Sequence, residues 1–124
     1  MKGAKVLILG WTFKENVPDV RNTRVVDIVT ELCSYGVNCL PVDPHADPDE
    51  VRHEYGVDLL DSAEAGAPYD AIILAVKHRC LIEAYPLEEL RRLGGDQAPV
   101  LIDVKGFFSP EQLVGWGSGR YWRL

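Results

Sequence analysis

Three short apolar runs constrain the fold of this chain more than any other feature. Residues 5–9 (KVLIL), 71–76 (AIILAV) and 100–104 (VLIDV) are almost entirely aliphatic and show no alternation with polar residues. Short continuous runs of this kind are typical of strands buried on both faces of a parallel sheet. We therefore expect these three segments to form the centre of such a sheet.

An amphipathic helix is predicted between the first and second strands. Residues 24–35 place apolar side chains at positions i, i+3, i+4, i+7 and i+8, which fall on one helical face: Val25, Ile28, Val29, Leu32 and Cys33. Thr23 can cap the start of this helix, and Gly36 stands where a left-handed residue would end it.

Three further strands are expected at the margins of the sheet. Residues 37–43 form the second strand, in which Pro41 favours an edge or a strand end because proline lacks an N–H donor. Residues 57–60 add a brief strand, and residues 121–124 form a terminal edge strand.

Three further helical segments have recognisable starts or breaks. Asp47 caps a short helix that has Pro48 at its first position and ends at Gly56. A helix from Cys80 is interrupted at Pro86, since proline breaks a helix unless it occupies the first turn. Residues 109–112 (SPEQ) form another capping box. Alternating strands and helices predict a three-layer αβα sandwich, a Rossmann-like doubly wound α/β fold with a parallel sheet of about five or six strands.

Composition limits the domain organisation and the partners. The 124 residues, 47% hydrophobic and 26% charged, suit one globular domain with one core over residues 1–124. A formal charge of −6 argues against a general nucleic-acid binder, which would have a basic face. No apolar run of about twenty residues is present, so we expect no membrane span.

The three cysteines, Cys33, Cys39 and Cys80, form no C-x-x-C motif and are odd in number. This pattern fits a reducing cytoplasm and argues against a disulfide framework or a zinc site. We interpret them as small apolar residues.

The connection from Gly10 to Arg24 is predicted to be a binding loop. It is about twice as long as the roughly two to six residues usual between a strand and a helix in α/β domains. Lys14, Arg21 and Arg24 lie near the first turn of the predicted helix, where free backbone N–H groups and the helix dipole favour an anion.

The residues themselves leave a second interpretation of this loop open. Its cations can instead pair locally with Glu15 and Asp19 in a solvated loop, since such ion pairs are common and weak. Trp11, Phe13 and Pro18 argue against disorder, because the two aromatic residues favour packing and proline stiffens the chain.

Two further polar residues follow predicted strands. An acidic residue at the position of Asp43 often binds a ribose hydroxyl in dinucleotide-binding folds. The first turn, however, lacks the G-x-G-x-x-G pattern and has only Gly10, so we expect Asp43 to order the turn instead. His78 can hydrogen-bond a ligand or cap the next helix, and both roles remain open.

Two motifs resemble a known family. Residues 10–16 (GWTFKEN) and 19–27 (DVRNTRVVD) resemble the first strand, loop and helix of the C-terminal domain of the UDP-glucose/GDP-mannose dehydrogenases, which are nucleotide-sugar 6-dehydrogenases. The resemblance is closest to the branch that oxidises UDP-N-acetylhexosamines. It extends through residues 35–37, 42–44 and 71–78 and on to 102–106 and 121–124, so it covers essentially the whole chain.

The resemblance implies a division of labour. In this family an N-terminal Rossmann domain binds NAD, a central helical region mediates dimerisation, and the C-terminal domain binds the UDP end of the sugar nucleotide. The chain would then be a piece of a longer, cytoplasmic, homo-oligomeric enzyme of polysaccharide biosynthesis, in which Met1 need not be native. Its partners would be the UDP-sugar and the other two domains.

Residue roles follow from the same resemblance. Phe13 and Lys14 match a pair that contacts the nucleotide sugar, with Lys14 supplying charge to the diphosphate or the nascent uronate. Arg21 matches an arginine that reaches NAD, and Lys105 lies on a segment that contributes a basic residue to the nucleotide. Gly106 stands where some relatives have arginine, and Arg24 has no assigned role.

The implied reaction converts the C6 alcohol of the sugar to a carboxylate through a cysteine thiohemiacetal. That cysteine precedes this domain in the family, and none of the three cysteines here lies in a matching motif. We therefore assign no catalytic residue and no metal ligand, and we expect the isolated chain to be inactive.

The alternative to a domain of a longer enzyme is a free-standing nucleotide-binding or regulatory module. A complete small enzyme is disfavoured, because three His and three Cys at these spacings assemble no catalytic triple.

Overall fold

A computed structural model describes residues 4–11, 25–44, 46–66, 68–75, 79–95, 99–104, 108, 111, 116 and 121–123. Among these residues no helix is long and apolar enough to cross a membrane.

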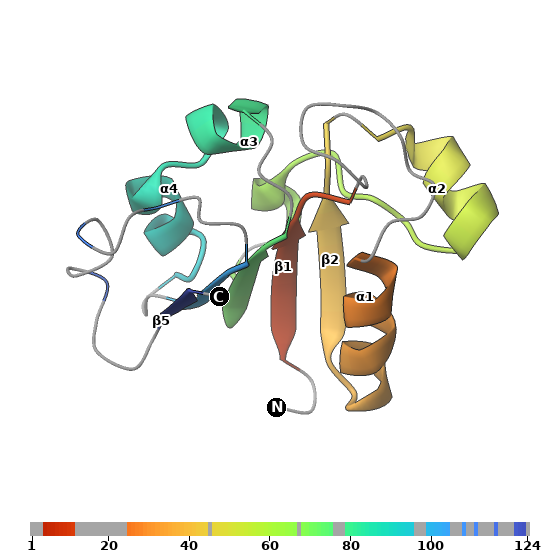
Figure 1. The fold of residues 1–124 in the computed structure, drawn as a ribbon, viewed down its shortest axis with the longest axis horizontal. Helices are drawn as coiled ribbons and strands as arrows, with labels where there is room; N and C mark the ends of the chain where they lie inside the picture. Colours follow the sequence, from red (N-terminus) through yellow and green to blue (C-terminus); the bar gives the residue numbers. More distant parts are fainter. Residues whose placement is uncertain are drawn as a thin grey trace.

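The described residues form a sheet of five parallel strands in the order β2-β1-β3-β4-β5 (Figure 1). The strands are β1 (Lys5–Leu9), β2 (Asn38–Val42), β3 (Ala71–Leu74), β4 (Val100–Asp103) and β5 (Tyr121–Arg123). The three apolar runs are the three interior strands, as predicted. The strand that contains Pro41 and the C-terminal strand are the two edges, also as predicted.

Pro41 suits an edge strand because its backbone carbonyl points away from β1. Its carbonyl accepts a hydrogen bond from the N–H of Leu60 at 2.9 Å, on the side away from β1. The missing N–H of proline therefore costs no hydrogen bond between β1 and β2.

The prediction of a strand at residues 57–60 is wrong: these residues are not in a strand. Pro41 offers residues 57–60 a carbonyl but no N–H donor, so the hydrogen-bond ladder of the sheet does not extend beyond β2.

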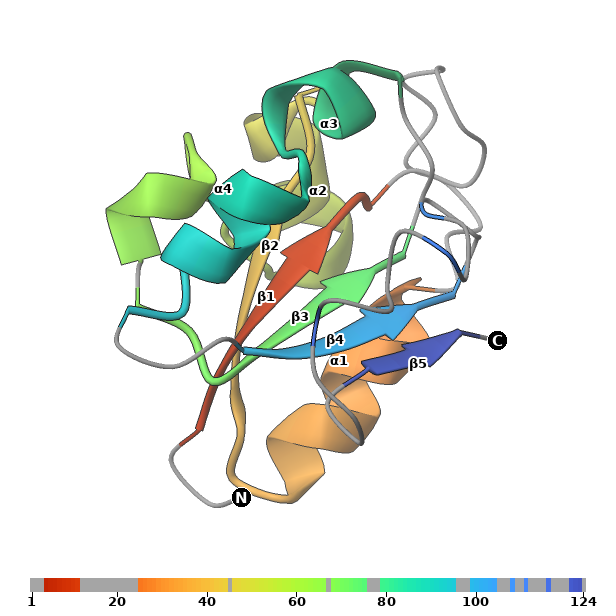
Figure 2. The same ribbon diagram turned by 90° about the vertical axis from the view of Figure 1, so that its left-hand side faces the viewer.

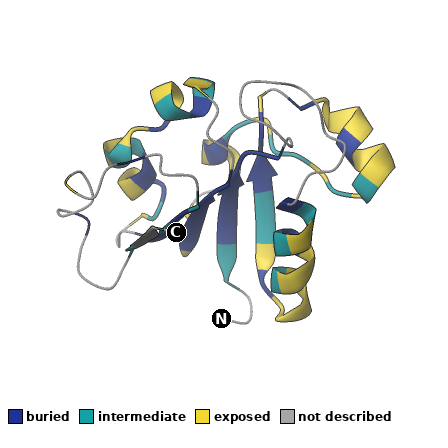
Figure 3. Cartoon of the chain, viewed as in Figure 1, coloured by how far each residue is buried: buried dark blue, intermediate teal, exposed yellow. Residues whose placement is uncertain are grey.

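Helices cover both faces of the sheet, which confirms the three-layer architecture (Figure 2). They are α1 (Val25–Ser34), α2 (Pro48–Tyr55), the 3₁₀ turn η1 (Ala63–Gly66), α3 (Arg79–Ala84) and α4 (Leu87–Arg92). Because side chains alternate along a strand, Val6 and Ile8 of β1 pack in the cluster that includes residues of α1 and α2. Leu7 and Leu9 pack on the opposite face, in the cluster that includes residues of α3 and α4. Figure 3 shows that β1 and β3 are mostly buried and that the outer sides of the helices are exposed.

The limits of α2 and the break between α3 and α4 lie at the predicted residues, whereas Thr23, predicted to cap α1, lies outside the described residues. The Asp47 carboxylate accepts the N–H groups of Asp49 at 2.9 Å and Glu50 at 3.4 Å, and α2 ends at Gly56 with φ 68°. Pro86 separates α3 from α4 and stands at the N-cap of α4. Of the capping box predicted at residues 109–112, only Glu111 lies within the described residues.

Tyr69 fastens η1 to the sheet. Its hydroxyl donates to the carbonyl of Ala63 at 2.6 Å, and the residue is 2% exposed. Burial raises the pKa of Tyr69 to about 12, since the phenolate would lose its hydration.

This burial predicts a loss of stability at alkaline pH. The folded-state pKa of Tyr69 lies above its unfolded value, so its contribution is present below about pH 10 and is lost as the pH rises toward 12. Tyr69→Phe should lower the free energy of unfolding by about 1 kcal/mol at pH 7, because the carbonyl of Ala63 loses its donor. It should also flatten the decline between pH 10 and 12. Urea denaturation at pH 7 and 11 measures both effects, with the exposed Tyr35→Phe as the control. An equally steep alkaline decline in wild type and Tyr69→Phe would contradict the prediction.

Candidate functional site

The carboxyl ends of three strands form one level row. Leu9 of β1 pairs with Leu74 of β3, which pairs with Asp103 of β4. The pairing continues one residue further, with the N–H of Ala75 donating to Leu9 and that of Val104 donating to Leu74. The connections that follow these strands therefore leave the sheet from the same edge. The strand order reverses between β1 and β3, which is where open parallel sheets bind ligands.

A buried carboxylate holds the beginning of the long connection after β1. Gly10 has φ 106°, a conformation that favours glycine, and its N–H donates to the carbonyl of Val42 at 2.9 Å. The next N–H, that of Trp11, donates to Oδ2 of Asp43 at 2.6 Å. Asp43 is 5% exposed. The prediction that Asp43 orders this turn is confirmed.

The side chain of Trp11 adds a second anchor. It is fully buried and packs edge-on against Tyr55 of α2, with ring centroids 5.6 Å apart. At the other end of the connection, Val25 is buried at the first position of α1. Both ends of the connection are thus fixed to the same side of the sheet. The residues between them lie outside the described part of the chain, including Phe13, Lys14, Arg21 and Arg24.

A second carboxylate performs the same task after β4. Asp103 is fully buried at the last position of that strand, and its Oδ2 accepts the N–H of Phe108 at 3.0 Å. This bond closes the short connection that carries Lys105, which itself lies outside the described residues. Sequence reasoning missed this role of Asp103. An acidic residue inside an apolar strand and shortly before a glycine is the sequence feature that points to it.

The two anchored connections are near neighbours at this edge. One strand separates β1 from β4, so at a spacing of about 4.8 Å per strand the connections begin about 10 Å apart. The two carboxylates accept backbone N–H groups, and both are negatively charged when ionised. An anionic ligand here therefore requires compensating cations, which the sequence supplies in residues 12–24 and at Lys105.

Cys80 lies close to this edge, on α3, but is poorly suited to nucleophilic chemistry. Burial raises the pKa of its thiol, and the negative charge of Asp43 raises it further. A thiol that remains protonated is a weak nucleophile. His78 lies outside the described residues. Within the described ranges, no three His, Cys, Asp or Glu side chains come together as a possible metal site.

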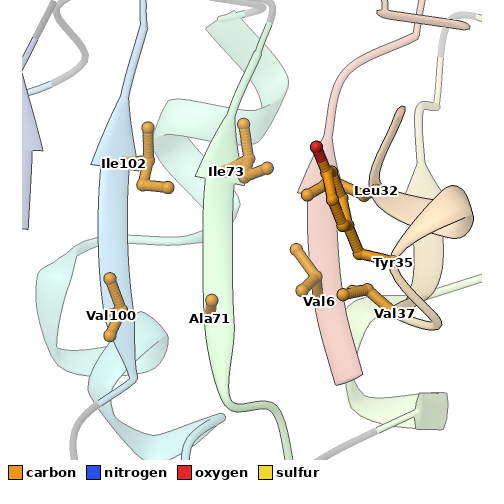
Figure 4. Close-up of a pocket in the computed structure, with 8 residues that line it drawn as sticks. All are labelled: Val6, Leu32, Tyr35, Val37, Ala71, Ile73, Val100 and Ile102. Atoms are coloured by element: carbon orange, nitrogen blue, oxygen red, sulfur yellow. The ribbon is translucent and has the colours of Figure 1, made fainter. Parts of the chain in front are cut away.

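A hollow on one face of the sheet is unsuited to binding an anion. It has a volume of about 550 Å³ and lies on the α1 side of β1, β3 and β4 (Figure 4). Its lining is hydrophobic apart from the Tyr35 hydroxyl: Val6, Leu32, Tyr35, Val37, Ala71, Ile73, Val100 and Ile102. Because no charged group lines this hollow, it offers no partner for a phosphate.

Comparison with known proteins gives a consistent assignment. Residues 7–110 match the UDP binding domain of the UDP-glucose/GDP-mannose dehydrogenase family. The chain is 44% identical over 112 residues to a UDP-N-acetyl-D-glucosamine 6-dehydrogenase of Salmonella typhi, covering 90% of this chain and 26% of that protein. It is 46% identical over 103 residues to the enzyme of the same name from Pseudomonas aeruginosa, covering 83% and 24%. The chain thus spans about a quarter of the length of these relatives.

Solved structures show the same fold. The NDP-N-acetyl-D-galactosaminuronic acid dehydrogenase of Methanosarcina mazei superposes with a TM-score of 0.77 at 22% identity, over 99% of this chain and 24% of that one. The sequence motifs, the fold and the family match all indicate the same family. The chain belongs to the UDP-glucose/GDP-mannose dehydrogenase family and corresponds to its UDP binding domain.

Proposed function

We propose that the carboxyl edge of the sheet binds the UDP end of a UDP-sugar, within a longer NAD-dependent nucleotide-sugar 6-dehydrogenase. The observation that carries the proposal is the pair of connections after β1 and β4. Each leaves the same edge, each is anchored by a buried aspartate, and each contains at least one basic residue of the family motif. A rigid scaffold that anchors cation-bearing connections suits recognition of a diphosphate.

Four residues of the family motif have proposed roles. Phe13 and Lys14 contact the nucleotide sugar, and Lys14 neutralises charge on the diphosphate or the product carboxylate. Lys105 approaches the nucleotide from the connection after β4. Arg21 reaches NAD across the cleft between domains. These roles rest on the motif that the residues occupy and on the shared origin of the two connections.

The substrate proposed is a UDP-N-acetylhexosamine. Identity to the two UDP-N-acetyl-D-glucosamine 6-dehydrogenases is 44% and 46%, whereas identity to the UDP-glucose 6-dehydrogenase of Rhizobium meliloti is 25%. The product would be a uronate for polysaccharide biosynthesis in the cytoplasm, and the full-length enzyme would be a homo-oligomer.

NAD is proposed to bind mainly to the remainder of the longer chain. The dinucleotide fingerprint is absent after β1, and the carboxylate of Asp43 is engaged by the N–H of Trp11. The residues present therefore do not fit a dinucleotide in the usual Rossmann position, apart from the proposed contact of Arg21. NAD would supply hydride acceptance from elsewhere in the longer chain, and this domain would contribute binding and orientation of the UDP moiety. The isolated chain is accordingly expected to be inactive.

Lys14→Ala should weaken UDP binding by about tenfold to a hundredfold in the full-length enzyme, because a charge-assisted contact to phosphate contributes about 1.5–3 kcal/mol. Isothermal titration calorimetry with UDP measures the change. Lys5→Ala is the matched control, since Lys5 lies at the amino end of β1 with its ammonium 5.8 Å from the Tyr69 ring centroid. Equal affinities for wild type and Lys14→Ala would remove Lys14 from the site. Tight NAD binding by the 124-residue chain alone would contradict the division between domains.

Steady-state kinetics should separate two roles within the connection. Lys14→Ala is expected to raise the apparent KM for the UDP-sugar, and Arg21→Ala that for NAD, with little change in thermal stability. Both substrates should be varied for each variant. Wild-type values in both variants would exclude the connection from the site.

Asp43→Ala tests the anchor beneath the connection. Removing the carboxylate leaves the buried N–H of Trp11 without this acceptor, which should cost about 1–3 kcal/mol of unfolding free energy and weaken UDP binding. Asp58→Ala is the control, since Asp58 pairs with Arg52 in solvent and should leave both quantities nearly unchanged. Urea denaturation and calorimetry give the two readouts. The proposed anchor fails if both aspartate variants behave alike.

A further inference from the structure

The turn between α1 and β2 brings two cysteines to one corner of the molecule. Gly36 has φ 79°, and its N–H donates to the carbonyl of Cys33 at 3.0 Å, while the N–H of Val37 donates to that of Leu32 at 3.3 Å. This pair of bonds is the Schellman arrangement that ends a helix and reverses the chain. Cys33 lies in the last turn of α1, and Cys39 is the second residue of β2. The reversal therefore places the two side chains next to each other.

The two thiols lie at one hollow that is open to solvent. The Cys33 thiol is close enough to Cys39 to contribute to the raised pKa of the Cys39 thiol. Both line a surface hollow of about 370 Å³ at the amino edge of the sheet, together with Lys5, Val37, Asn38 and Leu40. Cys33 is exposed, and Cys39 is half-buried against the cluster beneath α1. A small reagent can thus reach the pair from solvent.

The two thiols differ in their readiness to react. Burial raises the pKa of Cys39 to about 11, and the neighbouring Cys33 adds to the effect. Cys39 is therefore almost entirely protonated near neutral pH. Because Cys33 is the exposed member of the pair, an external reagent meets Cys33 first, and Cys39 is placed to react second.

We propose that Cys33 and Cys39 form an oxidisable dithiol, which reacts with low-molecular-weight disulfides of the glutathione class and closes to an intrachain disulfide. The thiolate of Cys33 attacks one sulfur of the external disulfide, forms a mixed disulfide and releases one external thiolate. Cys39 then loses its proton to solvent and attacks Sγ of Cys33, which releases the second external thiolate. Two protein thiols are oxidised, and one external disulfide is reduced to two thiols.

The position of the pair makes this reaction independent of the proposed UDP site. The bond would tie the last turn of α1 to the amino end of β2, whereas Asp43 and the candidate site lie beyond the carboxyl end of that strand. The disulfide requires the two sulfurs to approach to roughly 2.05 Å, and any movement that this needs falls at the amino end of β2, an edge strand. Oxidation should therefore leave UDP affinity unchanged.

Peptide mapping tests the proposal directly. Trypsin cleaves after Arg24 and next after Arg52, so both cysteines fall within peptide 25–52, and Cys80 falls in a different peptide. The full-length protein is incubated with oxidised glutathione at pH 8, alkylated and digested without reduction. The expected wild-type peptide 25–52 is lighter by two hydrogens and carries neither an alkyl group nor glutathione.

Serine variants of Cys39 and Cys80 separate the two steps. Cys39→Ser should retain glutathione on Cys33, with a mixed disulfide that persists at least about tenfold longer than in wild type, because no neighbouring thiol displaces it. Cys80→Ser is the control and should close its disulfide as wild type does. Two alkyl groups on the wild-type peptide, or a mixed disulfide as persistent as in Cys39→Ser, would overturn the proposal.

A dithiol reagent provides a second measurement that does not require a disulfide. Phenylarsine oxide binds across two adjacent thiols, so peptide 25–52 of the wild type should retain one arsenical. Cys33→Ser and Cys39→Ser should each lose it. Retention by either single variant, or no retention by the wild type, would show that the two sulfurs do not act as a pair.

Discussion

The hydrogen bond from the N–H of Trp11 to the buried carboxylate of Asp43 is the contact on which the candidate site depends. It joins the ends of β1 and β2, next to the point between β1 and β3 where the strand order reverses. The buried ring of Trp11 then fixes the same point against α2. A buried carboxylate is costly unless donors surround it, so this contact favours a single path for the chain as it leaves the sheet. The basic connection that follows therefore starts from a fixed position.

Asp103 repeats this arrangement after β4 by accepting the N–H of Phe108. The two aspartates organise backbone, and the cations needed for an anionic ligand are carried by the connections themselves. This arrangement separates the scaffold from the ligand contacts. It also explains why an acidic chain with a formal charge of −6 can present a local site for a diphosphate.

Much of the fold was predictable because its causes are local in the sequence. The continuous apolar runs identified β1, β3 and β4, and the capping residues Asp47 and Gly56 identified the limits of α2. The strand expected at residues 57–60 failed, since strand formation there depends on what the neighbouring strand offers. Pro41 of β2 presents a carbonyl and no donor. The motif predicts Phe13, Lys14, Arg21 and Lys105 as binding residues, and all four lie outside the described residues, so this part stays a prediction.

The sequence alone determined which segments are buried, where helices begin and end, and which residue types the family motif presents. These properties depend on side-chain periodicity and on backbone preferences within a few residues. Only the tertiary structure decided that Asp103 closes the connection after β4, that Trp11 packs on Tyr55, and that Cys33 and Cys39 lie side by side at one hollow. Each of these contacts depends on the direction in which a side chain leaves its helix, strand or turn, and on how those elements pack together. Spacing along the chain does not encode those directions.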